Sequence, residues 1–486
     1  MWSEIERGEN LSIPRTPTRQ SRRALASGAF GATLEYFDFA LYGAMAATVF
    51  PAVFFERSDP SAALLASFAT FGVGVVARPL GGIVFGYLGD RLGRRNVLLA
   101  TFLLMGVAMT AIGLIPGYAA VGFVAPTILV ALRFLQGFAL GGEATGVQLM
   151  TMEHAPPDRR AFYGAVLGMG SPISQVAANS VLAVLSGTLS ESAFLAWGWR
   201  VPFLLSVLLV AVGIYVRLRV EETPLFRVQV AGEARPGPMS VVRLHGMTIL
   251  RLMLGFAPIT LTFYLVTVFG ISHLTAHGFS SSETFTILMV ANALATGAAF
   301  CGGRLADRIG RRQVLLIGSG VTLVSAGSFF PAVTTRDFTT VLLVVVIASC
   351  GAQFGNAAQA ALFAEAFPTH LRYTGSALGL TGVNLVFAAP TPFLCAWLVG
   401  IGGVTAVAGY WIGVIILAMI TVALLPDGRS LEGLPLAFAR RRDISGKAES
   451  AARRRLHEGS APAHVRDAWE SGSPGPTRAA PEARRR

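Results

Sequence analysis

The chain contains a long series of apolar stretches, each of a length that crosses a lipid bilayer, with polar loops between them. A helix needs about 20 consecutive apolar residues to span the hydrocarbon core, and a chain inside lipid must satisfy its own backbone hydrogen bonds. The pattern therefore predicts an all-α membrane protein with twelve transmembrane helices. These spans, numbered 1 to 12, are expected near residues 24–50, 61–88, 96–116, 120–150, 161–187, 199–218, 247–272, 284–305, 313–334, 338–366, 374–400 and 404–425.

The composition excludes a soluble enzyme. Only 14% of the 486 residues are charged and 53% are hydrophobic, whereas soluble proteins carry about 25% charged residues. The net charge of +12 comes mainly from arginines in loops and in the C-terminal tail, so we expect lipid around the protein and no nucleic-acid partner. The sequence shows no metal-ligand cluster, nucleophile–base set or phosphate-binding loop, and we expect no metal, cofactor or enzymatic activity.

Arginine is concentrated in the loops that follow spans 2, 4, 6, 8 and 10. Because positively charged loops stay on the cytoplasmic side, both termini of this multi-pass protein of the cell membrane are expected in the cytoplasm. The arginines of these loops are Arg91, Arg94, Arg95, Arg159, Arg160, Arg219, Arg227, Arg235, Arg243, Arg308, Arg311, Arg312 and Arg372.

A ten-residue string occurs twice, from Gly86 to Arg95 and from Gly303 to Arg312. Both copies follow an even-numbered span, so the repeats share one orientation and predict two six-helix, pseudo-symmetric halves related by an axis along the membrane normal. The expected parts are a cytoplasmic N-terminal tail (1–23), an N-terminal half (24–218), a central cytoplasmic loop (219–246), a C-terminal half (247–425) and a disordered cytoplasmic tail (426–486).

The repeated string, G-x-x-x-D-R-x-G-R-R, resembles the signature loop of the major facilitator superfamily. In span 1, the string E-Y-F-D-F from Glu35, followed by Tyr42-Gly43, resembles the metabolite:proton symporters of that superfamily. In span 4, Arg133-x-x-Gln136-Gly137 resembles a second superfamily signature, whose arginine is linked to proton transfer. The resemblance implies the major facilitator fold and transport by alternating access.

The repeated string is expected to form a gate. Its glycines permit a tight turn and close helix approach, and Asp90 and Asp307 are placed to pair with arginines or to cap the following helix. Such a latch would hold the halves together on the cytoplasmic side in one state and break in the other; the alternative is that the arginines only set topology. The gating residues are Gly86, Asp90, Arg91, Gly93, Arg94, Arg95, Gly303, Asp307, Arg308, Gly310, Arg311 and Arg312.

Span 1 carries two carboxylates, Glu35 and Asp38, on one helical face near mid-membrane. An ionised residue at a helix centre costs roughly 2.5–3.5 kcal/mol on insertion scales, which favours a function such as proton carriage. We expect Asp38, Glu35 and Arg133 to couple transport to protons. Structural ion pairs with arginines of other spans are the alternative.

An arginine in span 4 cannot face lipid, so Arg133 is expected to point into a central cavity, where it would anchor an anionic substrate or tune a carboxylate. Polar residues of spans 7 and 10 are expected to line the same cavity, unless they only form interhelical hydrogen bonds. His273 and His277 are expected in an external loop. The candidate substrate-binding residues are Tyr42, Arg78, Arg133, Gln136, Glu143, Tyr264, Gln353 and Asn356.

The leading hypothesis is a proton-coupled symporter that imports a small polar metabolite, an organic acid or carboxylate, and works as a monomer. Its partners are then the small-molecule substrate, protons and membrane lipid. A proton-driven exporter in the same fold is the alternative. A membrane receptor or scaffold, whose basic tail binds lipid or a partner, is a third hypothesis.

Overall fold

The computed structural model describes residues 19–56, 59–92, 94–141, 159–219, 238–367 and 371–424, all within one compact unit that covers Met1–Gly428. These residues fold almost entirely into helices, and no strand occurs among them. Six of their helical stretches are long and apolar enough to cross a membrane. Each of the twelve expected spans coincides with described helix, although the end of the expected span 120–150 lies outside the described residues.

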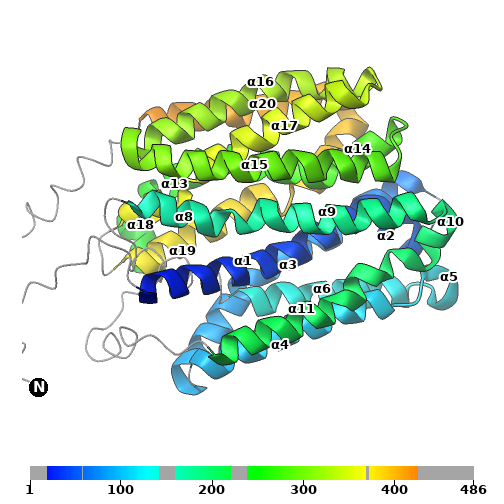
Figure 1. Ribbon diagram of the computed structural model, residues 1–486, viewed down its shortest axis with the longest axis horizontal. Coiled ribbons are helices and arrows are strands. Elements are labelled where there is room, and N and C mark those ends of the chain that lie inside the picture. The colour runs from blue at the N-terminus through cyan, green and yellow to red at the C-terminus, as the bar shows by residue number, and fades with distance from the viewer. Residues whose placement is uncertain are drawn as a thin grey trace, which may run out of the picture. The chain divides into compact units, whose positions relative to one another are not determined.

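The first six spans are each formed by one or two helices, joined on the side away from the arginine-rich loops by short helical turns (Figure 1). The spans are α1 (Arg19–Thr48), α3 (Pro60–Leu92), α4 (Arg94–Leu114), α6 (Val124–Leu140), α8 (Arg160–Gly168) with α9 (Gly170–Thr188), and α11 (Arg200–Arg219); the short turns are α2 (Phe50–Phe54), α5 (Tyr118–Val121), α10 (Glu191–Ala193) and the π-helix η3 (Phe194–Gly198).

Spans 7 and 11 are interrupted by π-helical turns, which in other proteins are frequent at functional sites. Gly403 has a positive φ of 65° and divides the last helix into the end of span 11 and span 12. The helices are α13 (Pro238–Tyr264), η4 (Leu265–Phe269), α14 (Gly270–Ala276), α15 (Ser281–Ile309), α16 (Arg311–Thr334), α17 (Phe338–Asn356), α18 (Gln359–Glu365), α19 (Arg372–Val383), η5 (Asn384–Ala388) and α20 (Thr391–Ala423).

Two features of span 7 differ from the expectation. Helix α13 begins at Pro238, inside the stretch expected as central loop, and bends at His245, whose backbone is not helical. The expectation that His273 lies in an external loop is wrong, because this residue is buried in α14. Its ring stacks on Phe269 at 5.6 Å and lies 4.2 Å from the His277 ring. The helical segment of span 7 therefore runs from Pro238 to Ala276 and is longer at both ends than the expected span 247–272.

Helices α3 and α6 touch at their backbones. A Cβ atom on Gly137 would lie 1.8 Å from the Gly74 carbonyl oxygen, and one on Gly81 would lie 1.8 Å from the Phe138 carbonyl oxygen. Small residues allow such an approach between helices in membranes, where packing rather than the hydrophobic effect drives association. The contact places the following stretch of α3, which includes Arg78, directly beside α6.

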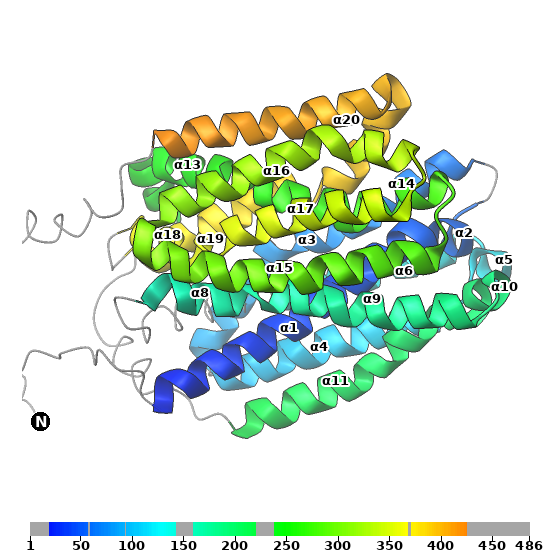
Figure 2. The same cartoon turned by 45° about the horizontal axis from the view of Figure 1, so that its top comes forward.

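The two halves also pack together along their helices. In both Figure 1 and Figure 2, α15 runs beside α8 and α9 of the first half, in agreement with the residue contacts between them. Helix α1 meets η4, where a Cβ atom on Gly43 would lie 2.8 Å from a methyl group of Val268. Each contact involves one helix that carries candidate site residues, α15 in the first and α1 in the second.

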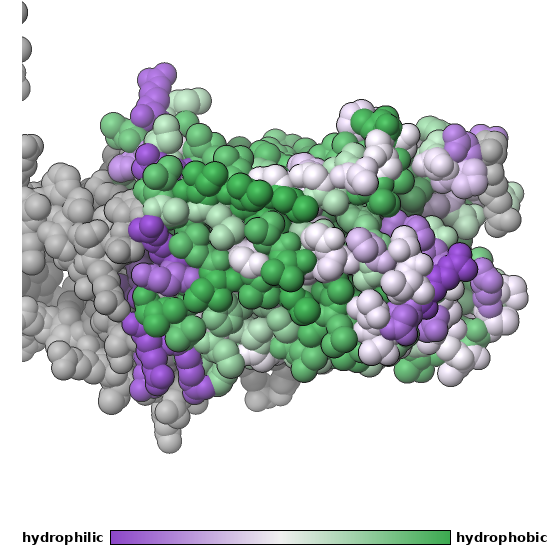
Figure 3. All heavy atoms as spheres, turned by 90° about the horizontal axis from the view of Figure 1, so that it is seen from above, coloured by the Kyte–Doolittle hydropathy of each residue, from purple (hydrophilic) through white to green (hydrophobic). Residues whose placement is uncertain are grey.

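The surface agrees with a position in a bilayer. Figure 3 shows apolar side chains over the middle of one face and hydrophilic side chains gathered toward the ends of the helices. Large apolar side chains such as Ile83, Leu208 and Ile401 are exposed. A surface of this kind is stable against lipid and would not be stable against water.

Gly137→Ala is expected to lower the thermal unfolding midpoint of the purified protein, because the new methyl group would overlap the Gly74 carbonyl and overpacking costs about 1–3 kcal/mol. Gly409→Ala is the matched control, since a Cβ atom there meets nothing within 4 Å. Equal midpoints for the two variants would contradict the backbone contact between α3 and α6.

Candidate functional site

Asp38, Arg133 and Gln136 form a closed hydrogen-bonded triangle between α1 and α6. Arg133 Nη1 lies 3.4 Å from Asp38 Oδ2 and donates to Gln136 Oε1 at 2.8 Å, while Gln136 Nε2 donates to Asp38 Oδ1. All three residues are 0% exposed. The charge of Asp38 is thus balanced by Arg133, and the Gln136 amide connects the two charged groups.

Aromatic rings surround the guanidinium of Arg133. Its Cζ lies 4.0 Å from the centroid of the Tyr42 ring, 4.5 Å from that of Phe39 and 5.2 Å from that of Phe71. Nε and Nη2 have no hydrogen-bond partner among the described residues, so the ring faces supply part of the stabilisation that water would give. Gly74 leaves room for the group, because a Cβ there would lie 2.5 Å from Arg133 Nε.

A second ion pair lies next to the first. Arg78 Nη2, on α3, is 3.2 Å from Glu35 Oε1, on α1, and the two side chains are 17% and 11% exposed. The guanidinium of Arg78 also lies 4.1 Å from the Phe39 ring centroid. One phenylalanine therefore contacts both guanidinium groups, and the two pairs form one charged cluster.

The sequence spacing on α1 explains how one helix serves both pairs. Asp38 and Phe39 lie three and four residues after Glu35, and Tyr42 lies four and three residues after them, which places all four on one face of a helix. The hydroxyl groups of Tyr42 and Thr70 are 2.7 Å apart and share a hydrogen bond that holds this face against α3. Both carboxylates pair with arginines of other spans, as the alternative interpretation of the sequence expects.

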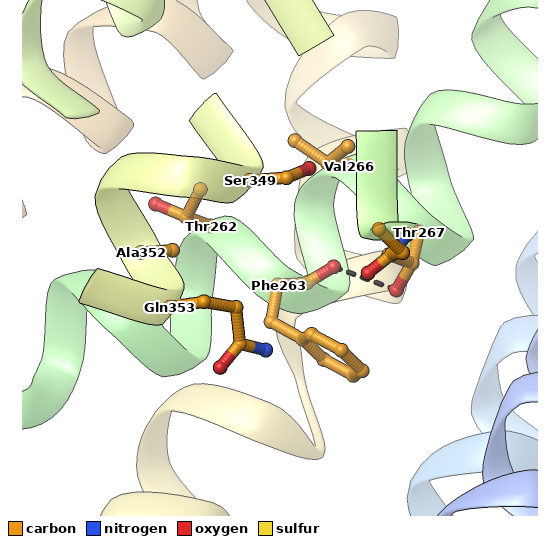
Figure 4. Close-up of a pocket in the computed structure, with 8 residues that line it drawn as sticks. Thr262, Phe263, Val266, Thr267, Ser349, Ala352 and Gln353 are labelled. Atoms are coloured by element: carbon orange, nitrogen blue, oxygen red, sulfur yellow. Dashed lines mark hydrogen bonds between the residues drawn. The ribbon is translucent and has the colours of Figure 1, made fainter. Parts of the chain in front are cut away.

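The second half contributes a small, uncharged pocket lined by both polar and apolar side chains. Figure 4 shows it between α13, η4 and α17, and Asn292 of α15 also lines it. Gln353 lies in its wall and accepts a hydrogen bond of 3.1 Å from the Asn356 amide. The lining residues are Thr262, Phe263, Val266, Thr267, Asn292, Ser349, Ala352 and Gln353, none of them charged.

Gln353, Asn356 and Tyr264 are predicted from the sequence, whereas Asn292 and Ser349 are not. An asparagine inside an otherwise apolar span is rare in lipid, and that rarity could have identified Asn292. Tyr264 joins the pocket to the charged cluster: it follows Phe263 on α13, and its ring centroid lies 5.4 Å from that of Phe71 on α3. The two candidate groups of residues therefore meet at an aromatic contact between the halves.

The second copy of the repeated string joins the halves on the side of the arginine-rich loops. Asp307, near the end of α15, accepts hydrogen bonds from the backbone N–H groups of Ala161 (3.0 Å) and Phe162 (2.9 Å) in the first turn of α8. Arg311 Nη2 lies 3.6 Å from Asp307 and 3.0 Å from Glu365. Asp307 thus pairs with an arginine as expected, but it caps a helix of the other half, and the following helix α16 has no side-chain cap.

In the second copy of the repeated string, Gly303, Gly310 and Arg312 each have a structural role of their own. Gly310 has a φ of 108° and ends α15, and a Cβ atom on Gly303 would lie 2.4 Å from Ala165 of α8. Arg312 donates to the carbonyl of Ala423 at the end of α20. The side chains of the first copy (Gly86, Asp90, Arg91, Gly93, Arg94 and Arg95) and Glu143 lie outside the described residues.

Comparison with known proteins identifies the class of membrane protein that this fold represents. The chain matches the Major Facilitator Superfamily over residues 28–390 and 298–471. It therefore belongs to the major facilitator superfamily, whose fold has twelve helices, and it is a transporter rather than an enzyme. Among the described residues, no group of three or more His, Cys, Asp or Glu could hold a metal ion.

Relatives of known description are similar over most of their length. The chain is 37% identical to the inner membrane metabolite transport protein YhjE of Escherichia coli (strain K12), covering 85% of this chain and 96% of that protein. It is 34% identical to the shikimate transporter of the same organism, covering 84% and 95%. The crystal structure of a D-xylose-proton symporter superposes with a TM-score of 0.68 at 17% identity, covering 84% of this chain and 98% of that one; this likeness concerns the fold.

Asp38→Asn and Arg133→Gln are each expected to destabilise the purified protein by several kcal/mol, because each leaves a charge buried without its partner, which costs about 3–5 kcal/mol. The double variant should lose less than the sum of the two. Thermal unfolding midpoints measure both effects, with the exposed Glu191→Gln as control. Additive losses would contradict a direct interaction between the two side chains.

Proposed function

We propose that this protein is a proton-coupled symporter that imports a small organic acid by alternating access. The observation that carries the proposal is the Asp38–Arg133–Gln136 triangle, which is fully buried inside a bundle whose helices include several long and apolar enough to cross a membrane. A buried pair of this kind is weak evidence for stability, since apolar residues of similar volume are often as stable. A carboxylate that gains and loses a proton during the cycle gives a reason for keeping the charges.

The roles follow from position. Asp38 carries the coupling proton, and Arg133 stabilises its charged form. Gln136 accepts a hydrogen bond from Arg133 and donates one to Asp38, and so holds the two charged groups in place. Glu35 takes part in coupling through its pair with Arg78. The substrate contacts Tyr42, Arg78, Glu143, Tyr264, Gln353 and Asn356.

Two relatives support a substrate with a carboxyl group. The shikimate transporter and the proline/betaine transporter of Escherichia coli (strain K12), each 34% identical to this chain, are named for small molecules that carry one. An arginine fork binds a carboxylate well, and Arg78 is the more accessible of the two arginines. The neutral pocket of the second half suits the polar remainder of such a molecule.

The arrangement in the membrane is part of the proposal. We place both termini and the central loop in the cytoplasm of a monomer in the cell membrane, with halves at 24–218 and 247–425 and tails at 1–23 and 426–486. The Asp307 contact with α8 is then a cytoplasmic latch that breaks when the protein opens inward.

Uptake into proteoliposomes tests the function. With an inside-alkaline pH gradient, the wild-type protein should accumulate at least one of shikimate, proline and glycine betaine, and collapse of the gradient should abolish accumulation. Asp38→Asn should lose gradient-driven accumulation, because a neutral side chain carries no proton, while Glu191→Gln should retain it. Accumulation driven only by the opposite gradient would indicate the exporter, and accumulation that ignores the gradient would refute proton coupling.

The latch has its own test. Ala364 is buried against Tyr163 of α8, so a cysteine there, with the three native cysteines replaced by serine, reports opening through its rate of maleimide labelling. Asp307→Ala removes charge-assisted hydrogen bonds worth about 1.5–3 kcal/mol each and should raise the rate at least tenfold. Glu191→Gln should leave the rate unchanged, and an unchanged rate in Asp307→Ala would show that Asp307 does not hold the gate.

A further inference from the structure

The two carboxylate–arginine pairs differ in how accessible they are. The side chains of Asp38 and Arg133 are 0% exposed, whereas those of Glu35 and Arg78 are 11% and 17% exposed. Gln136 bridges the first pair, and among the described hydrogen bonds it makes no contact with the second. The Glu35–Arg78 pair is therefore the one that a small molecule can reach and open.

The donors of Arg78 are only partly used. Its Nη2 faces Glu35 Oε1, while its buried Nε has no hydrogen-bond partner among the described residues. A guanidinium group offers five N–H donors in a planar fork that fits a carboxylate at two points. The Phe39 ring, at 4.1 Å, covers one face of the group and leaves its edge as the binding side. Arg78 thus has the form of a carboxylate receptor to which Glu35 binds at one nitrogen.

Among the described residues, the two carboxylates and two guanidinium groups of the charged cluster add to zero when all four are ionised. The charged and titratable described groups near Glu35 are Asp38 and Tyr36 on α1, Arg78 on α3, Arg133 on α6 and Tyr264 on α13. From α9, the described polar contact is the Ser174 hydroxyl on the Thr33 carbonyl. A second carboxylate on Arg78 would therefore leave one excess negative charge in the membrane interior, which is strongly disfavoured.

We propose that Glu35 occupies, on Arg78, the place of the substrate's carboxylate, and that Glu35 takes up one proton when the substrate displaces it. The site then holds two positive and two negative charges before and after binding. One proton enters from solution for each monoanion bound, and no covalent bond is made or broken. Release reverses the exchange: Glu35 loses its proton on the other side of the membrane and returns to Arg78. This inference rests on the proposed function and assigns a coupling step to the second carboxylate of span 1.

The pocket of the second half specifies the rest of the substrate. Its polar lining groups are hydroxyls and amides, and it has no charged described residue to balance a second charge on the ligand. Tyr264 and Phe263 connect it to the charged cluster through Phe71. The substrate class is therefore a small monocarboxylate whose uncharged body carries hydroxyl groups. Ser349 and Gln353 are its binding groups, since Thr262, Thr267 and Asn292 already hydrogen-bond within the protein.

Equilibrium binding to the purified full-length protein tests the exchange, with shikimate, a trihydroxy monocarboxylate, as the probe and its uncharged methyl ester as the matched analogue. In the wild-type protein, shikimate affinity should fall about tenfold per pH unit once Glu35 is ionised in the free protein, because one proton is bound with each anion. The ester should bind at least tenfold more weakly than shikimate at pH 5.5.

Variants of the pair separate the exchange from a structural role. Over the pH range in which Asp38 stays ionised, Glu35→Gln should bind shikimate with an affinity independent of pH. At pH 7.5 it should bind at least tenfold more tightly than wild type, because its amide does not compete for Arg78 as an anion. Glu35→Asp should keep the pH dependence, Arg78→Gln should lose binding, and Glu191→Gln should match the wild type. Thermal midpoints confirm that each variant is folded.

A pH dependence that persists in folded Glu35→Gln would overturn the exchange, and so would an ester that binds as well as the acid. No shikimate binding to the wild-type protein at any pH would overturn the hydroxy-monocarboxylate class. None of these results touches the proposed function, which fails instead if gradient-driven uptake survives Asp38→Asn. If uptake by the wild-type protein is proton-driven but its shikimate affinity does not depend on pH, the proposed symporter function is retained and the role of Glu35 is rejected.

Discussion

A charge placed inside a bilayer must be neutralised, and this requirement organises the first half of the structure. Four charged side chains enter the bundle from α1, α3 and α6, and each finds its opposite on a neighbouring helix: Glu35 with Arg78 and Asp38 with Arg133. The Phe39 ring touches both guanidinium groups. A proton or an anion that entered one of these pairs would change a charge balance that lipid cannot restore.

The glycine contacts between α3 and α6 make this balance geometrically possible. With the backbones in contact at Gly74 and Gly137, the side chains of Arg78 and Arg133 reach the same face of α1. The second half lacks such charges among its described pocket residues and offers hydroxyl and amide groups instead. The two halves share one architecture, but the interior of the first half contains ion pairs, whereas the described pocket of the second half contains only neutral groups.

Much of this could be predicted from the sequence, for a physical reason. A charge in an apolar stretch is costly enough to stand out, so Glu35, Asp38, Arg78 and Arg133 were identifiable one by one, as were the twelve spans. Which carboxylate meets which arginine depends on helix register across α1, α3 and α6, and no local pattern encodes that. Ser349 was missed because serine is common at helix contacts in membranes and is a weak signal, whereas the rarity of asparagine in an apolar span could have identified Asn292. The fold followed from periodic and local features, whereas the partners followed from packing over long distances in the chain.

The contact of Asp307 with the first turn of α8 has an implication for the origin of the chain. A helix start has unpaired N–H groups, and here the carboxylate that satisfies two of them comes from the opposite repeat. Asp307 of the second half thus completes a helix start of the first half, while helices such as α15 and α17 are capped by residues of their own half. If two identical halves had once met as separate subunits, the same carboxylate would have reached across the dimer interface, and the contact would be an internal form of that intersubunit bond.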